Sequence, residues 1–416
     1  MKKAVITILG TIGGTFDKEI KKYIVKEDFP KSVYHSKEIF LKKEYYTNVF
    51  PLLIDTFSSE YEIVPIFTKE SKEVQEQVLE KLEDKKKWIK VFENGVLIED
   101  ENNFKVLFQN IDKKLNQYDK VIIDVSHGFR HLPLLMLIDV LVQNIKYPGK
   151  VEKILFAKEE IKNKKYEIID LKEYLDLANI TYALSTFTKN YTISSTITTS
   201  INEYNEFLKE LNDFSSHILA NSLKELKNKS EKLIKQIEDI NKEKKEYEIF
   251  VIFNNYLEEI KNHMEEILKF SNEKEDYKRL YYFSKNMYKK GYLLNSITLL
   301  SEAVGMYIAS KVFSQDIEIK NYIEAYRRSK RFKAYELSNN SKNILRYKKR
   351  FNDTYLSNED KNLEKKITNK IKNKKFFNEN NLRNLIRKID NLRNNLAHGN
   401  ASEAISDVGN KIEIFK

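Results

Sequence analysis

The 416-residue sequence contains no cysteine, and it has only one tryptophan, five prolines and ten glycines. The absence of cysteine excludes disulfide frameworks, thiolate zinc sites and cysteine nucleophiles. It also suits a reducing compartment, so we expect a cytoplasmic protein. The small share of proline and glycine excludes collagen-like repeats, and 41% hydrophobic residues are enough to form folded cores. At about 150 residues per domain, the length corresponds to two or three folding units.

Long hydrophobic runs are missing as well. The run Ala4–Leu9 is short, rich in β-branched residues and followed by glycines, which favours a buried strand over a signal peptide. The run Leu132–Val142 contains Pro133 and Asp139, and it is much shorter than the roughly 20 residues that span a bilayer. We therefore expect a soluble protein with no membrane partner.

Positive charge is distributed unevenly along the chain. Residues 1–180 contain 30 Lys and Arg against 30 Asp and Glu, and residues 181–320 contain 20 against 21, whereas residues 321–416 contain 23 against 11. Eight of the ten arginines lie between Arg327 and Arg393. Because guanidinium groups can bind phosphate in a bidentate manner, this segment suits a polyanionic partner. A solvated surface rich in lysine and asparagine is the alternative explanation.

The first third of the chain alternates short apolar runs with segments of helical spacing, which is the pattern of a parallel sheet covered by helices. Helical spacing occurs near residues 40–57, 70–84, 103–116 and 131–145. The predicted strands are Ala4–Leu9, Tyr61–Phe67, Val121–Val125, Lys153–Ala157 and Tyr166–Leu171, with shorter candidates at Tyr23–Lys26 and Val33–Phe40. The predicted fold class of this part is a Rossmann-like α/β domain.

From about Leu171 onward the pattern is helical, which predicts an all-α C-terminal part. Leucines and isoleucines between 219 and 240 follow a spacing of four and three residues, with Ser230 at one expected position. This segment could form a short coiled coil, but packing against the apolar run Ile249–Leu268 is the favoured interpretation. Other expected features are a central buried helix within 288–313, basic segments at 327–350 and 361–375, and a closing helix near Glu379–Leu396.

A glycine-rich loop follows the first predicted strand. Its residues are Gly10, Thr11, Ile12, Gly13, Gly14 and Thr15. Open α/β sheets bind ligands at the carboxyl ends of their strands, so the loop could bind a phosphate or a nucleotide. It lacks both the G-x-G-x-x-G spacing and the lysine of a P-loop, and a simple tight turn is the alternative. A dinucleotide-dependent oxidoreductase is disfavoured, because no acidic residue follows at the ribose-binding distance in a clear second strand.

A polar cluster surrounds the end of the predicted strand Val121–Val125. It comprises Asp124, Ser126, His127, Gly128, Phe129, Arg130 and His131. Backbone amides at Gly128 and the guanidinium of Arg130 can bind a phosphate, and Ser126 and His127 can donate hydrogen bonds to a ribose or a base. A zinc site built on the aspartate and the two histidines is disfavoured, because it would have only three ligands. A capped helix with one buried histidine is the other alternative.

The segment Asp124-Val125-Ser126-His127-Gly128 resembles the motif of the DxTHG-type CRISPR-associated proteins, with serine in place of threonine. The N-terminal domain of that family is the CRISPR-associated Rossmann fold, or CARF. The resemblance implies that this domain binds a cyclic oligoadenylate across a twofold dimer interface, and it favours cyclic tetra-adenylate. The contacts would come from Gly10–Gly13 and from the polar cluster at 124–130.

A third motif lies near the end of the sequence, where Arg393, Asn394 and His398 precede Gly399. A separation of five residues places Arg393 and His398 about 140° apart around an ideal helix. A helix that ends at Gly399 could turn His398 back towards Arg393. From the residues alone, a surface pair at a helix end is the more common explanation.

The same three residues resemble the R-x4-H signature of HEPN domains, which are helical nucleotide-binding and ribonuclease modules. The two resemblances imply a CARF domain over residues 1–175 and a HEPN domain over 281–416, and they leave a helical connector over 176–280 unmatched. The HEPN resemblance also implies a homodimer or higher oligomer, in which two Arg393/His398 pairs form one site that cleaves single-stranded RNA. Neither a metal nor a cofactor is expected.

Cleavage of this kind needs no metal, because the 2′-hydroxyl beside the scissile phosphate is the nucleophile. The imidazole of His398 can accept and donate the proton, and Arg393 can neutralise charge in the transition state. Asn394 can position the phosphate or the histidine. The products would carry a 2′,3′-cyclic phosphate and a 5′-hydroxyl. Glu302, on the predicted central helix, could orient Arg393 or could be a structural carboxylate paired with any nearby cation.

The resulting hypothesis is a cyclic-oligoadenylate-activated endoribonuclease of type III CRISPR antiviral defence. The alternative is a nucleotide-sensing regulator that binds RNA through its basic segments without cleaving it. The intact Arg393/His398 pair favours the enzyme over the regulator.

Overall fold

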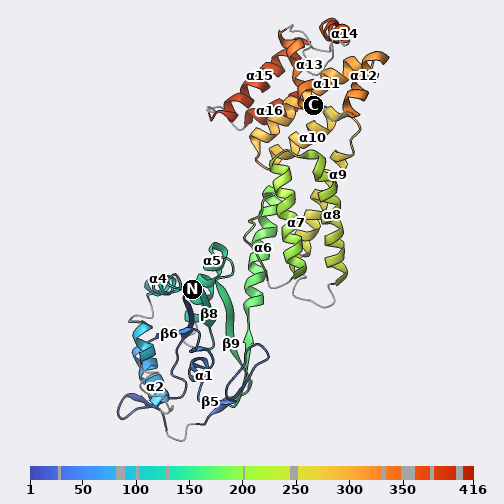
Figure 1. Cartoon of the computed structure of the whole chain (residues 1–416). Coiled ribbons are helices and arrows are strands. Elements are labelled where there is room, and N and C mark those ends of the chain that lie inside the picture. The colour runs from blue at the N-terminus through green and yellow to red at the C-terminus, as the bar shows by residue number, and fades with distance from the viewer. Residues whose placement is uncertain are drawn as a thin grey trace. The chain divides into compact units, whose positions relative to one another are not determined.

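The computed structural model describes residues 1–26, 30–80, 90–99, 103–127, 131–199, 202–243, 252–328, 334–347, 361–374, 379–399 and 406–416. The chain divides into two compact units (Figure 1). The first contains Met1–Ala183 and Ser194–Asn205, and the second contains Leu184–Ile193 and Glu206–Lys416. Within the described residues, the first unit combines strands and helices and the second is helical. The α/β and all-α fold classes expected from the sequence are therefore confirmed.

The α/β unit is built on an eight-stranded sheet. Its strand β1 (Lys3–Ile8) pairs in parallel with β8 (Lys120–Asp124) on one side and with β6 (Glu62–Phe67) on the other. Beyond β6 lies β7 (Val96–Leu97), and beyond β8 lie, in order, β9 (Val151–Ile161), β10 (Lys165–Asp170), β4 (Ser32–His35) and β5 (Tyr45–Tyr46). The five runs predicted as strands all form strands of this sheet.

Two pairs of strands differ from the parallel sheet that the sequence pattern predicted. Strand β10 is antiparallel to β9, and β5 is antiparallel to β4. Strand β9 continues to Ile161, so that only residues 162–164 connect it to β10, and the turn contains Asn163 in the left-handed conformation. A separate hairpin of β2 (Thr15–Asp17) and β3 (Lys22–Ile24) overlaps the strand predicted at Tyr23–Lys26.

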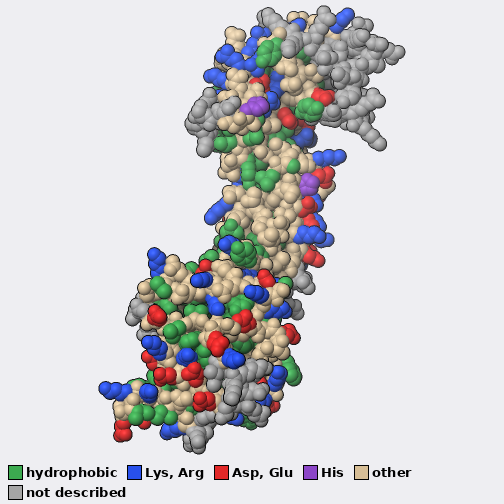
Figure 2. All heavy atoms as spheres, turned by 60° about the vertical axis from the view of Figure 1, so that its left-hand side comes forward, with side chains coloured by type: hydrophobic (Ala, Val, Ile, Leu, Met, Phe, Trp, Pro, Cys, Tyr) green, Lys and Arg blue, Asp and Glu red, His purple; other side chains and the backbone are tan. Residues whose placement is uncertain are grey.

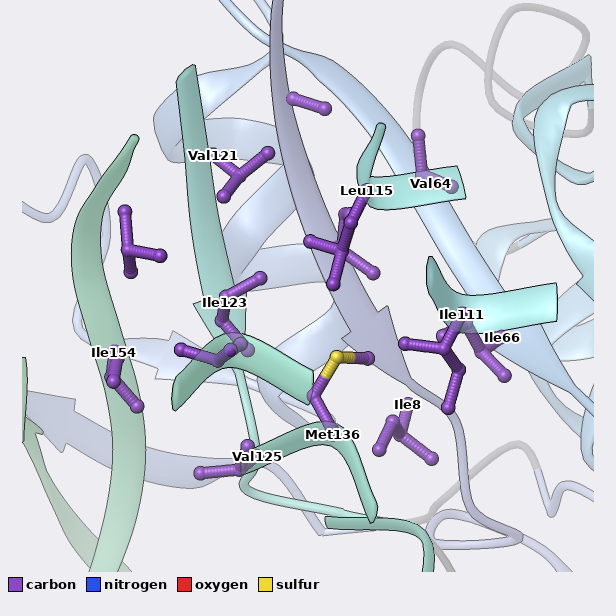
Figure 3. Close-up of a cluster of buried hydrophobic side chains, with 14 of the residues drawn as sticks. Ile8, Val64, Ile66, Ile111, Leu115, Val121, Ile123, Val125, Met136 and Ile154 are labelled. Atoms are coloured by element: carbon purple, nitrogen blue, oxygen red, sulfur yellow. The ribbon is translucent and has the colours of Figure 1, made fainter. Parts of the chain in front are cut away.

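Both faces of the sheet bury apolar side chains, which is why its central strands appear in the sequence as continuous hydrophobic runs. On one face, side chains such as Ile8 and Ile123 pack against Ile111 and Met136 from two helices (Figure 3). The helical elements of this unit are α1 (Val49–Phe57), α2 (Lys69–Glu80), the 3-10 helix η1 (Lys90–Asn94), α4 (Phe104–Leu115) and α5 (His131–Lys146).

The second unit follows the expected series of helices, with one addition. Helix α6 (Lys172–Asn190) belongs to the first unit up to Ala183 and to the second from Leu184 onward. The predicted closing helix is α15, and α16 follows it, so the expectation that α15 ends the fold was wrong. The helices after α6 are α7 (Asn202–Leu219), α8 (Leu223–Glu243), α9 (Asn254–Ser271), α10 (Asp276–Lys289), α11 (Leu293–Phe313), α12 (Ile317–Arg328), α13 (Ala334–Tyr347), α14 (Lys361–Asn373), α15 (Glu379–Ala397) and α16 (Ser406–Phe415).

Helix α8 packs against α9 in the same chain. In the middle of the four-three series, Leu226, Leu233 and Ile237 are buried together with Ser230, whereas Leu219 at its start is 41% exposed. The partner helix α9 overlaps most of the apolar run Ile249–Leu268 that the sequence indicated. Packing of an amphipathic helix on its neighbour is therefore confirmed as the favoured interpretation of this segment.

Helix α11 is the buried centre of the second unit, as predicted, and it contacts α10, α13 and α15. It approaches α13 so closely at Gly305 that a Cβ atom there would collide with Ser338. Among the described helices, only α11 is long and apolar enough to cross a membrane, and 61% of the relevant window is buried, as in the core helix of a folded domain.

Candidate functional site

The loops after β1 and β8 lie side by side at the carboxyl edge of the sheet. Of the two strands that flank β1, β6 comes earlier in the chain and lies on one side, and β8 comes later and lies on the other, so the strand order reverses between β1 and β8. Ligands of open α/β sheets bind outside the strand ends at such a reversal. The Thr7 hydroxyl of β1 donates a 2.6 Å hydrogen bond to the Asp124 carboxylate of β8, which fixes the two loops relative to each other.

Asp124 points into the protein. It is fully buried, and its carboxylate accepts hydrogen bonds from the Ser126 backbone amide at 3.2 Å and the Ser126 hydroxyl at 2.5 Å as well as from Thr7. Burial raises the pKa of Asp124, and the neighbouring His127 and these hydrogen bonds oppose that rise. Asp124 therefore holds the two loops in position from inside the protein.

Ser126 and His127 occupy different positions in the second loop. The Ser126 hydroxyl also accepts a 2.8 Å hydrogen bond from the Ala157 amide of β9, so it ties the loop to the sheet. His127 is half-buried, burial lowers the pKa of its imidazole, and its Nε2 atom has no hydrogen-bond partner within the described residues. The other predicted contacts of this loop, Gly128, Phe129 and Arg130, lie outside the described residues.

The Gly10–Gly13 loop presents backbone donors. The Gln75 amide donates to the carbonyl oxygens of Gly10 (2.9 Å) and Ile12 (3.2 Å), and the Asn48 amide donates to that of Ile12 at 2.9 Å. Within the described part of the chain, no hydrogen bond leaves the backbone N–H groups of Gly10, Thr11, Ile12 and Gly13. Side chains of the protein bind the carbonyl oxygens of Gly10 and Ile12, so the four backbone N–H groups of the loop can bind an anion.

The conformation of this loop depends on Gly13. Its φ angle of +106° is one that side-chain-bearing residues rarely adopt, and a Cβ atom there would lie 3.3 Å from Val78. Thr11 is half-buried, whereas Ile12 is 47% exposed beside the amides. The sequence located this loop but missed Asn48 and Gln75, because they come from α1 and α2 and no local pattern connects them to it.

The predicted cleavage residues lie at the C-terminal end of α15. Arg393 is half-buried and donates a 3.3 Å hydrogen bond to the Asn394 side chain, and His398 is exposed just after the helix. The backbone amide of His398 still bonds to the Asn394 carbonyl, and Gly399 follows with φ +69°. Within the described residues of one chain, no hydrogen bond joins Arg393 to His398.

A buried polar network lies behind Arg393. Asp390, one turn earlier on α15, forms ion pairs with Lys342 at 3.4 Å and Arg346 at 3.0 Å, both on α13. Its carboxylate also accepts a 3.2 Å hydrogen bond from Ser301 of α11, whose hydroxyl contacts the Lys342 ammonium. The network thus connects the three helices that hold the Arg393 segment.

Two members of this region have shifted pKa values. Burial lowers the pKa of Lys342, and Asp390 opposes the change. Burial raises the pKa of Glu302, and the positive charges of Lys342 and Arg393 act against it, in that order. Glu302 is therefore close enough to influence Arg393, although Lys342 is the stronger cationic neighbour. The sequence offered only weak signals for these partners, namely Asp390 three residues before Arg393 and the i,i+4 pair Lys342 and Arg346.

The net positive charge of the C-terminal segment is only partly available to a ligand. Asp316 binds Lys366 at 3.4 Å and Lys370 at 3.0 Å, which neutralises part of α14. By contrast, Arg387 and Lys388 on α15 are exposed and have no ion pair within the described residues. On the face shown in Figure 2, Lys and Arg side chains gather on the helical unit at the top of the view.

Together, the fold and its sites define a two-unit protein whose α/β unit brings two loops together at the carboxyl edge of its sheet and whose helical unit presents basic side chains. A protein-family model for the second domain of the CRISPR-associated protein MJ1674 matches residues 173–276, from α6 to the start of α10. The CRISPR-associated protein MJ1674 of Methanocaldococcus jannaschii is 23% identical over 239 residues, which cover 55% of this chain.

The alignment covers only 36% of that relative's length. The family model matches the segment that the sequence analysis treated as the connector and left outside both resemblances. The family model thus supports similarity to a CRISPR-associated protein through a region that contains neither motif. Among the described residues, no group of three or more His, Asp or Glu side chains is arranged to hold a metal ion.

Proposed function

We propose that this protein is a CRISPR-associated endoribonuclease that a cyclic oligoadenylate switches on. The observation that carries the proposal is the carboxyl edge of the sheet between β1 and β8, where the backbone amides of Gly10–Gly13, unpartnered within the described residues, follow the strand next to the one that leads to His127. Amides can bind phosphates, and the imidazole can bond to a ribose or a base. The similarity to a CRISPR-associated protein is consistent with such a ligand.

The proposed ligand is a ring with repeated nucleotides. The β1–β8 edges of two chains would therefore bind it best. Helix α5, which follows the His127 loop, supplies a surface suited to a second copy of the chain. Its exposed apolar stripe consists of Leu134 (61% exposed), Ile138 (52%), Val142 (51%) and Ile145 (46%), which follow helical spacing. Contiguous apolar surface of this kind is typical of a protein interface.

We expect the substitution Ile138→Glu to convert a dimer into a monomer, because it places a charge in the middle of this stripe. Sedimentation velocity on the parent chain and the variant would measure the change. The matched control is Ile317→Glu, which alters an isoleucine on α12 that is 71% exposed, and which should leave the mass unchanged. A parent chain that sediments as a monomer at micromolar concentration contradicts the dimer proposal.

The proposed reaction is attack of the RNA 2′-hydroxyl on the adjacent phosphorus, with departure of the 5′-oxygen. His398 would transfer the proton, and Arg393 would stabilise the charge that develops on the phosphate. Exposed Arg387 and Lys388 on the same helix would hold the RNA backbone. Because Arg393 and His398 are not hydrogen-bonded within one described chain, two copies would together complete the site.

The test is a cleavage assay on the full chain with a fluorophore–quencher RNA in the presence of EDTA. We expect cleavage only after addition of cyclic tetra-adenylate, with cyclic hexa-adenylate as the comparison ring, and fragments that end in a 2′,3′-cyclic phosphate by mass spectrometry. A fully 2′-O-methylated RNA is the matched control, since it lacks the nucleophile. If RNA binds but neither ring produces cleavage, the non-catalytic regulator is the correct function.

A further inference from the structure

A second candidate site lies in the helical unit, away from the cleavage residues. It is a cavity of about 860 Å³ between α9, α10, α11, α15 and α16. Volumes of this size are typical of small-molecule sites. Leu385 of α15 lines the cavity. It precedes Arg393 by two helical turns, or about 12 Å along the helix axis. The cavity is therefore distinct from the Arg393/His398 region.

Aromatic rings form a continuous series around this cavity. Phe270 stacks on Tyr282 with ring centroids 5.4 Å apart and planes 16° from parallel. Further ring pairs connect Tyr282 with Tyr281, Tyr281 with Phe415, Phe415 with Tyr307, and Tyr307 with Tyr277, at centroid distances from 5.3 to 6.0 Å. Because every one of these rings lines the cavity, it offers faces and edges on which a flat ligand can stack.

The cavity also carries positive charge. Lys285 and Lys289 are one turn apart on α10, and neither has a carboxylate within ion-pair distance among the described residues. Lys278, which also lines the cavity, differs from them because it is paired with Glu275. Among the described side chains that line the cavity, only that of Glu266 is a carboxylate. Two uncompensated ammonium groups on one helical face suit an anion such as a phosphate.

Buried polar atoms of the cavity lack partners. Asn286 is only 3% exposed, and its Nδ2 atom donates a 3.3 Å hydrogen bond to the Tyr191 hydroxyl. Its Oδ1 atom has no hydrogen-bond partner within the described residues, and the same holds for the buried hydroxyl oxygen of Tyr281. An unsatisfied buried carbonyl is unfavourable, so a ligand that brings an N–H group to Asn286 would be stabilised there.

From these observations we propose that the cavity binds a nucleotide. The base stacks among the rings of Phe270, Tyr282 and their neighbours, its N–H edge bonds to Asn286 Oδ1, and its phosphate pairs with Lys285 and Lys289. The nucleotide can be free or can be one unit of a single-stranded RNA. Binding here requires no cleavage, so the inference does not depend on the proposed ribonuclease activity.

The test measures binding to the full chain by equilibrium dialysis, with AMP, CMP, GMP and UMP in one arm and a 2′-O-methyl RNA hexamer in the other. The double variant Lys285→Gln/Lys289→Gln should weaken binding at least about tenfold. Tyr282→Leu, which removes a partly exposed ring, should have a similar effect through lost stacking. The matched control is Lys269→Gln, at an exposed lysine of α9 outside the cavity, and it should leave binding unchanged.

Photocrosslinking locates the ligand directly. A 5-iodouridine monophosphate bound in the cavity should label peptides that contain Tyr281, Tyr282 or Phe415 under ultraviolet light. Loss of mononucleotide binding in the variants identifies a free nucleotide as a ligand, whereas loss confined to the hexamer identifies the RNA strand as the source. Binding that all three cavity substitutions leave unchanged, or no binding in either arm, overturns the proposal.

Discussion

Replacing His398 with alanine is expected to lower activator-dependent RNA cleavage at least about 100-fold and to leave RNA binding unchanged, because the proton-transfer group disappears while the basic surface stays. The imidazole is exposed just beyond α15 and makes no hydrogen bond or ion pair with the described residues. Its removal therefore costs the fold little, and a loss of activity would not reflect unfolding.

Two measurements separate the chemical role of His398 from binding. Fluorescence anisotropy with a 2′-O-methyl RNA reports binding, and single-turnover cleavage of the matching ribonucleotide strand reports chemistry. His217→Ala on α7 is the matched control, since it removes a histidine of the same unit far from α15 in the sequence, and it should cut at the parent rate. A His398→Ala variant that also cuts at the parent rate eliminates this residue as the proton-transfer group.

The strands of the α/β unit were predictable because burial on both faces requires unbroken apolar runs, as in Val121–Val125. The start of α1, by contrast, was not predictable from the sequence. The sequence placed helical spacing from residue 40, whereas the helix begins at Val49 because the Asn48 side chain accepts a 2.9 Å hydrogen bond from the Phe50 amide and caps it. Propensity alone does not locate such a boundary.

The antiparallel hairpin of β9 and β10 was missed for a related reason. The last four residues of β9, Lys158–Ile161, are largely charged and exposed, so the sequence pattern predicted a loop there. Backbone pairing with β10 keeps this segment extended although only part of β9 is buried. The sequence pattern therefore indicated only the buried part of the strand, and it left residues 158–165 as a connection whose pairing with β10 it did not show.

The candidate sites divide in the same way. The Gly10–Gly13 loop and the pair Arg393 and His398 could be proposed from the sequence, because each stands as a short local motif at the end of a predicted strand or helix. The groups packed around them could not be proposed, because Gln75 reaches the first loop and Lys342 reaches Asp390 of α15 from elements that are distant in the sequence. Local sequence thus points to candidate site residues more readily than to the residues that support them.

Asp390→Asn is expected to destabilise the helical unit by about 3–5 kcal/mol, because it leaves the Lys342 ammonium buried without its counter-charge. The Lys342 side chain is 4% exposed and that of Asp390 is 16% exposed, so water cannot replace the lost carboxylate. Without Asp390 the pKa of Lys342 should fall further below its usual value, since burial already lowers it and the opposing charge is gone. Guanidinium unfolding would measure the loss.

A double variant distinguishes the buried ion pair from a general loss of packing. Adding Lys342→Met to Asp390→Asn removes the uncompensated charge, while the new amide can still accept a hydrogen bond from Arg346, so more than half of the lost stability should return. Asp239→Asn, which breaks the exposed Lys242 pair on α8, should change stability by less than about 0.5 kcal/mol. If the double variant is no more stable than Asp390→Asn alone, the buried charge is not what the aspartate compensates. The same network joins α11, α13 and α15 beneath Arg393. We therefore expect the double variant to recover stability more fully than cleavage, because cleavage also needs Arg393 in its original position.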